Sequence, residues 1–365
     1  MTALFEPLTL RDLTVKNRIW LAPMCQYAVE AADGVPTDWH LVHLGARAQG
    51  GFGLIIAEAT AVTPEGRISP QDTGLWNDEQ RDAWARIVDF VHTQDAAIGV
   101  QLAHAGRKAS TYRGFPGEPQ GSVPPGAGGW TTIGPSAEAF GGYTEPVELG
   151  VTEISEVVAA FAESARRADE AGFDVVEIHA AHGYLIHQFL SPLSNHRTDA
   201  YGGDFAGRTR LALEVAEAVR AVWPQEKPLF VRISATDWVD GGWDADQSVR
   251  LAAALGERGV DLVDTSTGGN ALADIPVGPG YQVPFARQIR ERAQIPTGAV
   301  GLIVEPQQAE KILAAGDADV VLLARAALRD PSWPQRAAAE LGLSWRDAPY
   351  PPAYVRGRWD DVPAL

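Results

Sequence analysis

The 365-residue chain has only one cysteine, Cys25. A single thiol excludes an intramolecular disulfide, an all-cysteine iron–sulfur cluster and a cysteine-rich zinc site. Sparse cysteine also fits a reducing compartment. The first twenty residues lack the basic segment followed by an apolar one that marks a signal peptide. From these features we expect a cytoplasmic protein.

Basic residues are also scarce. The chain has 30 Lys and Arg against 47 Asp and Glu, which gives a formal net charge of −17. Such a surface repels phosphate backbones and anionic lipids, so nucleic acid and membranes are not expected partners. No run of about 18 apolar residues occurs, and therefore no transmembrane helix is expected. The GxGxxG fingerprint of a Rossmann dinucleotide site does not follow the first expected strand.

Short apolar runs alternate with amphipathic helical segments along most of the chain. Eight runs are expected to be strands: Ile19–Ala22, Leu54–Glu58, Ile98–Leu102, Val175–His179, Leu229–Ser234, Leu262–Thr265, Ile295–Gly298 and Val320–Leu323. Eight strand–helix units predict an α/β protein with the (β/α)8 TIM-barrel fold, as one domain over residues 1–365. A doubly wound sheet is the competing arrangement, which periodicity alone does not exclude.

Three other segments stand apart from this repeat. Pro7–Val15 is expected to form a hairpin that plugs the bottom of the barrel. Residues 113–130 contain ten Gly or Pro among 18, which predicts an irregular loop. This loop is either a lid at the catalytic rim or a neutral surface insertion. Residues 344–365 are expected to form an extended C-terminal arm.

Polar side chains interrupt three of the expected strands, although barrel strands are normally apolar on both faces. The two-residue period places Gln101, Glu177, His179 and Arg232 on the inward side, toward the C-terminal mouth. A buried Arg costs several kcal/mol unless it is paired. Arg232 therefore serves either an internal ion pair, for example with Glu177, or a polar ligand at the mouth.

The expected fourth strand continues into His179-Ala180-Ala181-His182-Gly183-Tyr184. If a helical turn starts there, the two histidines lie on one side and can both donate hydrogen bonds to one substrate oxygen. Tyr184 then lies close enough to supply a proton. Two alternatives remain: the histidines are satisfied core residues, or they bind metal in a metal-dependent barrel hydrolase, for which HxxH alone is weak evidence.

The last two expected strands lead into Thr297–Gly301 and Ala324-Arg325-Ala326. Loops after strands seven and eight hold a phosphate group in many barrels, through backbone amides and a basic side chain. Arg325 makes a phosphate site the preferred interpretation of these glycine-containing loops.

Taken together, these motifs resemble the old yellow enzyme family over nearly the whole chain, and the thermophilic-like branch with its NADPH dehydrogenases and xenobiotic reductases in particular. The resemblance rests on APMCQY at 22–27, QLAHAGRK at 101–108, HAAHGY at 179–184, FLSP at 189–192, NHRTDAYGG at 195–203 and TGAVG at 297–301. It implies FMN at the barrel mouth. The cofactor-binding residues carried over by motif are Ala22, Pro23, Met24, Cys25, Ala59, Gln101, Arg232, Gly301, Ala324 and Arg325.

The same resemblance implies roles in substrate binding and catalysis. His179 and His182 correspond to the donors to the substrate oxygen, Tyr184 to the proton donor, and Tyr27 to a wall of the substrate pocket. Arg356 in the C-terminal arm corresponds to an Arg that reaches a neighbouring subunit's site, with Arg358 close by. This predicts a homodimer or homotetramer.

The implied activity is that of an ene-reductase. NADPH or NADH reduces the flavin, and hydride then passes to the β-carbon of an activated alkene such as an α,β-unsaturated carbonyl, a maleimide or a nitroalkene. Cys25, as a neutral or partly ionised thiol, is expected to tune the flavin rather than act as a nucleophile.

Overall fold

The computed structural model describes residues 2–359. Eight parallel strands close into a barrel in the order β10-β11-β12-β3-β4-β5-β8-β9. The barrel strands are β3 Ile19–Leu21, β4 Leu54–Ala61, β5 Ala97–Ala103, β8 Val175–Ala180, β9 Leu229–Ser234, β10 Leu262–Ser266, β11 Thr297–Ala299 and β12 Val320–Leu323. Because β12 pairs with β3 and β9 with β10, the sheet has no free edge. The predicted TIM barrel is confirmed, and the doubly wound alternative is excluded.

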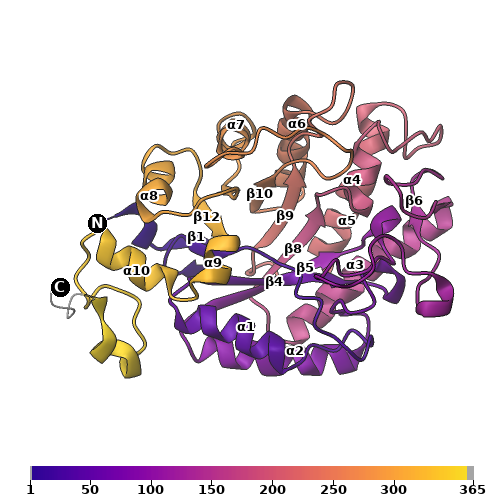
Figure 1. Ribbon diagram of the computed structural model, residues 1–365. Helices are drawn as coiled ribbons and strands as arrows, with labels where there is room; N and C mark the ends of the chain where they lie inside the picture. The colour runs from indigo at the N-terminus through magenta and orange to yellow at the C-terminus, as the bar shows by residue number, and fades with distance from the viewer. Residues whose placement is uncertain (1, 360–365) are drawn as a thin grey trace.

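Helices surround the barrel on its outside (Figure 1). They are α1 Asp38–Gln49, α2 Asp78–His92, α3 Val151–Glu170, α4 Leu185–Leu190, α5 Phe205–Val222, α6 Ala245–Gly256, α7 Val283–Ala293, α8 Pro306–Ala314, α9 Arg325–Arg329 and α10 Trp333–Glu340. Short 3-10 turns are η1 Ala3–Phe5, η2 Pro64–Gly66, η3 Gly106–Lys108, η4 Pro125–Ala127 and η5 Pro352–Gly357. No helix among the described residues is long and apolar enough to cross a membrane.

The predicted N-terminal hairpin is present and fills the lower end of the barrel. Strands β1 Leu8–Leu10 and β2 Leu13–Val15 pair antiparallel. Leu10 and Val15 belong to the same buried cluster as Trp20 and Phe230, which point into the barrel. The Trp20 and Phe230 rings stack with their centroids 5.6 Å apart. Side chains therefore close this end.

A β-bulge in β4 shapes the opposite end. The pairing of β4 with β5 skips Glu58, so that Ala57 faces Val100 and Ala59 faces Gln101. The extra residue lets Glu58 accept a hydrogen bond from the Gln26 amide at 2.7 Å while it lies 3.2 Å from His40 of α1. Bulges commonly re-aim side chains beside active sites. Here the bulge turns Ala59 toward the mouth.

The 113–130 loop is irregular, as predicted, except for η4. Arg113 fastens it to the barrel rim: Nη1 donates to the Tyr27 carbonyl at 3.1 Å and pairs with Glu30 at 2.6 Å. At the other end of the loop, Trp130 Nε1 donates to the Glu65 carbonyl at 2.8 Å. The loop therefore lies at the mouth, held at both ends.

The C-terminal arm packs beside α1 and α10 and forms η5 at the left edge of the molecule (Figure 1). Arg356 is exposed there. The Arg358 guanidinium lies 4.7 Å from the Trp345 ring centroid. Contact of Arg356 with a neighbouring subunit stays a prediction, and residues 360–365 of the expected arm lie outside the described residues.

Candidate active site

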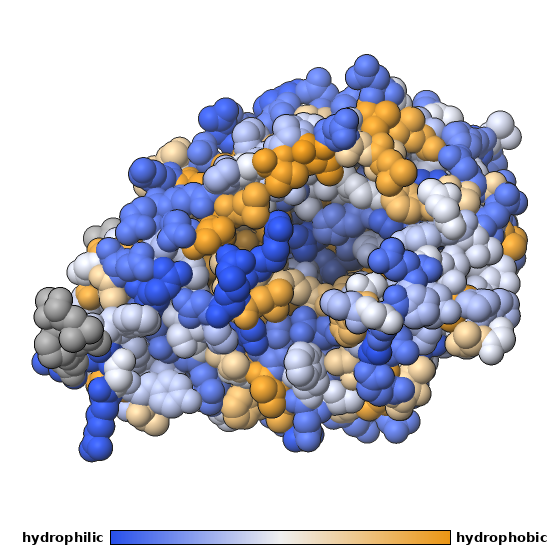
Figure 2. Space-filling view, in the orientation of Figure 1, coloured by the Kyte–Doolittle hydropathy of each residue, from blue (hydrophilic) through white to orange (hydrophobic). Residues whose placement is uncertain are grey.

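The mouth of the barrel opens onto a hollow with hydrophilic walls near the centre of the face in Figure 2. Gln101, Glu177 and Arg232 lie inside, as predicted, and all three are buried. Gln101 Nε2 donates to Glu177 Oε1 at 2.8 Å. Arg232 Nε lies 3.1 Å from Asp264 Oδ2, and Asp264 is fully buried.

Asp264 corrects one part of the sequence interpretation. The ion pair suggested for Arg232 with Glu177 forms with Asp264 instead, because the β9–β10 register sets Arg232 directly opposite Asp264. The sequence did contain a sign of this pairing, because Asp264 is a charged residue inside the apolar run Leu262–Thr265. Burial, and the nearby Asp264, raise the pKa of Glu177 to about 8, while Arg232 acts in the opposite direction.

The two predicted histidines do converge, although not through a helical turn. His182 and Gly183 have positive φ angles of 58° and 73°, and α4 begins only at Leu185. This left-handed reversal sets the His179 and His182 rings perpendicular with centroids 5.1 Å apart. Gly183 is required there, because a Cβ would lie 2.2 Å from the Gly269 carbonyl oxygen.

Both rings are neutral near pH 7. Burial and the charge of Arg232 hold the pKa of His179 and that of His182 well below their usual value. His179 Nδ1 accepts the Ala181 amide, so its proton lies on Nε2. His182 Nε2 lies 2.7 Å from the Ser266 hydroxyl. Each neutral ring has one N–H to donate: His179 Nε2 faces His182 Nδ1 at 3.4 Å and His182 Nε2 faces Ser266, contacts that a ligand oxygen would have to replace.

Tyr184 packs edge-on against the His179 ring, with centroids 5.0 Å apart. Burial raises its pKa well above 10, so the phenol keeps its proton. Tyr27 and Cys25 pack in the same small cluster at the mouth. Burial, with Asp72 and Glu58 nearby, also raises the pKa of Cys25 well above its usual value. Of the two protonation states expected for Cys25, the structure favours the neutral thiol.

Sequence reasoning gave no role to Lys108. Its ammonium donates to the carbonyl oxygens of His182 at 2.8 Å and Gly269 at 2.9 Å. It also lies 5.1 Å from the Tyr184 ring centroid. Burial lowers the pKa of Lys108 to about 8. Lys108 thus ties the histidine turn to the phenol beside it.

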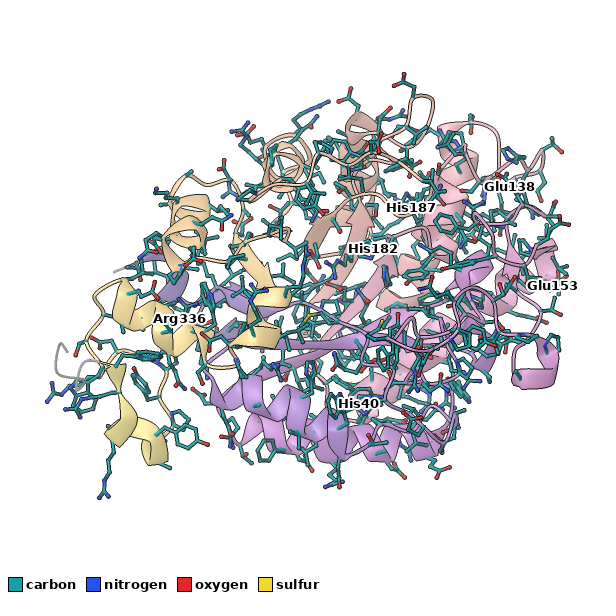
Figure 3. The ribbon with its side chains drawn as sticks, in the orientation of Figure 1. His40, Glu138, Glu153, His182, His187 and Arg336 are labelled. Atoms are coloured by element: carbon teal, nitrogen blue, oxygen red, sulfur yellow. The ribbon has the colours of Figure 1, made fainter. Side chains whose placement is uncertain are left out.

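A buried pair behind the turn was also missed. His187 Nε2 lies 3.0 Å from Asp237 Oδ1, and both side chains are fully buried. His187 Nδ1 accepts the Gly183 amide at 2.9 Å, which fixes the reversal that carries His182. The labels of His182 and His187 lie near each other in Figure 3, in agreement with this contact. The two partners are far apart in the chain, and no local pattern in the sequence signals their contact.

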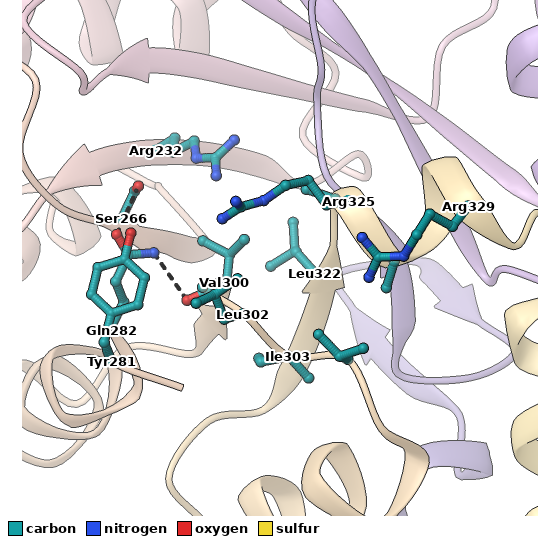
Figure 4. Close-up of a pocket in the computed structure, with 14 residues that line it drawn as sticks. Arg232, Ser266, Tyr281, Gln282, Val300, Leu302, Ile303, Leu322, Arg325 and Arg329 are labelled. Carbon is teal, nitrogen blue, oxygen red and sulfur yellow. Dashed lines mark hydrogen bonds between the residues drawn. The ribbon is translucent and has the colours of Figure 1, made fainter. Parts of the chain in front are cut away.

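A cavity of about 220 Å³ opens at the ends of β11 and β12. Arg232, Arg325 and Arg329 surround it (Figure 4). The predicted Gly301, Ala324 and Arg325 all line it, whereas Arg329, one helical turn after Arg325, was not predicted. Gly301 has φ 119°, a conformation that disfavours other residues. Three guanidinium groups around one small cavity suit a phosphate ester.

Of the remaining predicted residues, Ala22 and Ala59 lie around the same opening, whereas Met24 and the exposed Arg356 of the C-terminal arm do not. Ala22 follows the end of β3 and is buried, and Ala59 is buried at the mouth. Met24 instead packs against the outer layer between barrel and helices. Its side chain therefore faces that layer, and only its backbone follows the predicted segment.

Fold and site together define an eight-stranded barrel whose mouth combines a cavity lined by three arginines with neutral hydrogen-bond donors. The family model described as "NADH:flavin oxidoreductase / NADH oxidase family" matches residues 3–344. The chain belongs to this family, which confirms the predicted family and the predicted class of NAD(P)H-dependent flavin oxidoreductase.

Relatives and solved structures agree with this assignment. The NADPH dehydrogenase of Bacillus subtilis is 47% identical over 97% of this chain and 98% of its own length. That of Geobacillus thermodenitrificans is 50% identical over 94% and 95%. The structure of the old yellow enzyme homologue from Zymomonas mobilis covers 100% of both chains at 30% identity and TM-score 0.79. Morphinone reductase in complex with tetrahydroNAD is 29% identical, covers 100% and 98%, and has TM-score 0.78.

Proposed function

We propose that the protein is an FMN-dependent ene-reductase that uses NADPH or NADH to reduce activated alkenes. The observation that carries the proposal is the convergence, at one barrel mouth, of a three-arginine cavity with two neutral histidines and a protonated tyrosine. When bound, FMN would accept hydride from the nicotinamide and deliver it to the alkene. The relatives named NADPH dehydrogenase support NADPH as the reductant.

The residues present fit this cofactor. Gln101 uses its Nε2 on Glu177, which leaves its carbonyl oxygen as an acceptor for the imide N–H of the flavin pyrimidine. Arg232 offers positive charge for the neighbouring carbonyl oxygen. Arg325 and Arg329 would hold the phosphate, with Gly301 and Ala324 giving close approach of the backbone. Cys25 and Ala59 would flank the ring.

The substrate side follows from the same geometry. His179 and His182 donate to the carbonyl or nitro oxygen of the alkene and stabilise negative charge there. Tyr184 then gives its proton to the α-carbon. Tyr27, at the same small cluster, forms a wall of the pocket. These roles predict α,β-unsaturated carbonyls, maleimides and nitroalkenes as substrates.

The assembly is part of the proposal. Arg356 is exposed in the arm, so it is available to a second copy of the chain, whereas Arg358 stacks on Trp345. We infer a homodimer or homotetramer in which Arg356 approaches the neighbouring mouth.

A metal-dependent hydrolase is the alternative that HxxH left open. Within residues 2–359, no group of three or more His, Cys, Asp or Glu side chains is arranged to hold a metal ion. His179 Nδ1 is instead occupied by the Ala181 amide, and His182 Nε2 contacts the Ser266 hydroxyl. The geometry therefore favours the flavin enzyme.

The test is the visible absorbance of the purified protein, followed anaerobically. We expect a flavin spectrum that bleaches with NADPH and returns on addition of cyclohexenone. A colourless protein that cannot be reconstituted with FMN would overturn the proposal. Bleaching without return would leave a flavin-reducing protein and remove the ene-reductase step. Metal analysis of the same sample distinguishes the hydrolase.

A further inference from the structure

Two carboxyl groups and one guanidinium share the polar layer inside the barrel. Glu177 and Asp264 are fully buried, and Arg232 is 6% exposed. Arg232 pairs with Asp264 at 3.1 Å. Glu177 Oε1 accepts the Gln101 amide, and Glu177 Oε2 is buried with no hydrogen-bond partner among the described residues. The layer therefore has one cation for two acids.

The charges around Glu177 decide its protonation. From the neighbouring strands it faces Gln101 on β5, Arg232 on β9 and Asp264 on β10, and on its own strand it faces His179. Asp264 lies opposite the single cation and pairs with it, although burial raises the pKa of Asp264 as well, and His179 is neutral. A second carboxylate buried without a cation of its own would cost several kcal/mol. Binding a proton removes that cost, and the raised pKa of Glu177 agrees.

We propose that Glu177 holds a proton beside the pyrimidine edge of the bound flavin. In alkaline solution, where Glu177 has lost this proton, it takes up one proton from solvent when the flavin is reduced. This inference rests on the proposed function for its flavin. A hydride would supply two electrons and one hydrogen nucleus to a bound flavin, which would leave one negative charge beside Gln101 and Arg232. One proton from solvent binds the Glu177 carboxylate and forms a neutral acid. No other bond changes.

The first experiment measures the flavin midpoint potential between pH 6 and pH 10 in FMN-loaded protein. Above about pH 8, wild type should lose roughly 30 mV more per pH unit than below it, because one extra proton accompanies two electrons. Glu177→Gln keeps an oxygen for Gln101 but cannot titrate, so this extra slope should disappear. The matched control is Glu156→Gln, an exposed residue of α3, which should behave as wild type. The same slope in wild type and Glu177→Gln would overturn the proposal.

The second experiment uses FMN-free protein, so it does not depend on the proposed function. The pKa of Glu177 is raised from 4.5 to about 8, so between these pH values the unfolded chain is ionised there and the folded chain is protonated. The folded state then binds more protons, and its stability falls as pH rises through this window. Urea unfolding should therefore show Glu177→Gln gaining on wild type from pH 4.5 to pH 8.

A further variant, Asp264→Asn, should abolish the pH-dependent gain in stability that Glu177→Gln gives. In Asp264→Asn, Arg232 has only Glu177 left as an anionic partner in the layer, so Glu177 should ionise in the folded state. Adding Glu177→Gln to Asp264→Asn should then give no gain in the free energy of unfolding over Asp264→Asn alone as pH rises from 4.5 to 8. A stability difference between wild type and Glu177→Gln that is constant from pH 4.5 to pH 8 would overturn the stored proton. A failure to bind FMN would count only against the proposed function.

Discussion

The lower and upper halves of the barrel interior are built by the same strands but have opposite chemistry. Moving two residues along a strand keeps a side chain on the inner face. Three such steps pass from an apolar to a charged residue: Val175 to Glu177, Phe230 to Arg232, and Leu262 to Asp264. Below the step, the interior is a hydrophobic cluster closed by the N-terminal hairpin.

The difference separates stability from chemistry. The lower cluster is stabilised by apolar burial, at about 25 cal/mol per Å² removed from water. The upper layer buries ions and polar atoms, which at best offsets their desolvation. Stability that the lower half contributes therefore permits the strained and charged arrangement above it. Changes in the upper half should alter catalysis and titration, and changes in the lower half should alter unfolding alone.

The largest expected effect is on catalysis at the upper end. Tyr184→Phe should slow reduction of cyclohexenone by roughly 10²–10⁴-fold, the range for loss of a general acid. Flavin reduction by NADPH should be unchanged, because that step uses no proton from Tyr184. Stopped-flow measurement of the two half-reactions separates them. Tyr201→Phe, whose phenol contacts Glu214 on the outside of the barrel, is the control and should follow wild type in both half-reactions. Equal slowing of both half-reactions in Tyr184→Phe would show that the phenol is not the proton donor.

The next effect belongs to the lower end. Phe230→Ala should lower the free energy of unfolding by about 3–5 kcal/mol, because it removes a fully buried ring stacked on Trp20. Turnover per folded molecule should stay at the wild-type value. Urea denaturation and steady-state kinetics on one preparation check both. A large change in flavin binding with intact stability would contradict the division between the halves.

A smaller effect concerns the stability of the fold at acidic pH. Burial lowers the pKa of His104, which follows the end of β5, to about 4. Between pH 6.5 and 4 the unfolded chain binds a proton there that the folded chain does not, so this stability is present above pH 6.5 and is lost as pH falls. The loss should be about 3 kcal/mol.

His104→Asn should remove that loss, because Asn can still accept the Gly106 amide but cannot titrate. Urea unfolding at several pH values between pH 7 and the lowered pKa of about 4 measures it. His196→Asn, an exposed histidine paired with Glu138, is the matched control and should follow wild type. Parallel loss of stability in wild type and His104→Asn would count against burial of a neutral His104.

The barrel could be predicted well from the sequence because its strands are short apolar runs separated by amphipathic helical segments. Their alternation also placed Gln101, Glu177 and Arg232 on the inner face. Alternation cannot give register, however, and register is what pairs Arg232 with Asp264. The bulge at Glu58 and the left-handed turn at His182 depend on packing around them. His187 and Asp237 meet only because α4 folds back against the loop after β9.

The filled lower end has a consequence for kinetics. Because Leu10 and Val15 close the barrel from below, the nicotinamide and the proposed alkene would both have to enter through the mouth, one after the other. An enzyme with one shared entrance for both substrates should follow a ping-pong scheme, with parallel lines in double-reciprocal plots. An alkene in excess should then compete with NADPH and inhibit turnover.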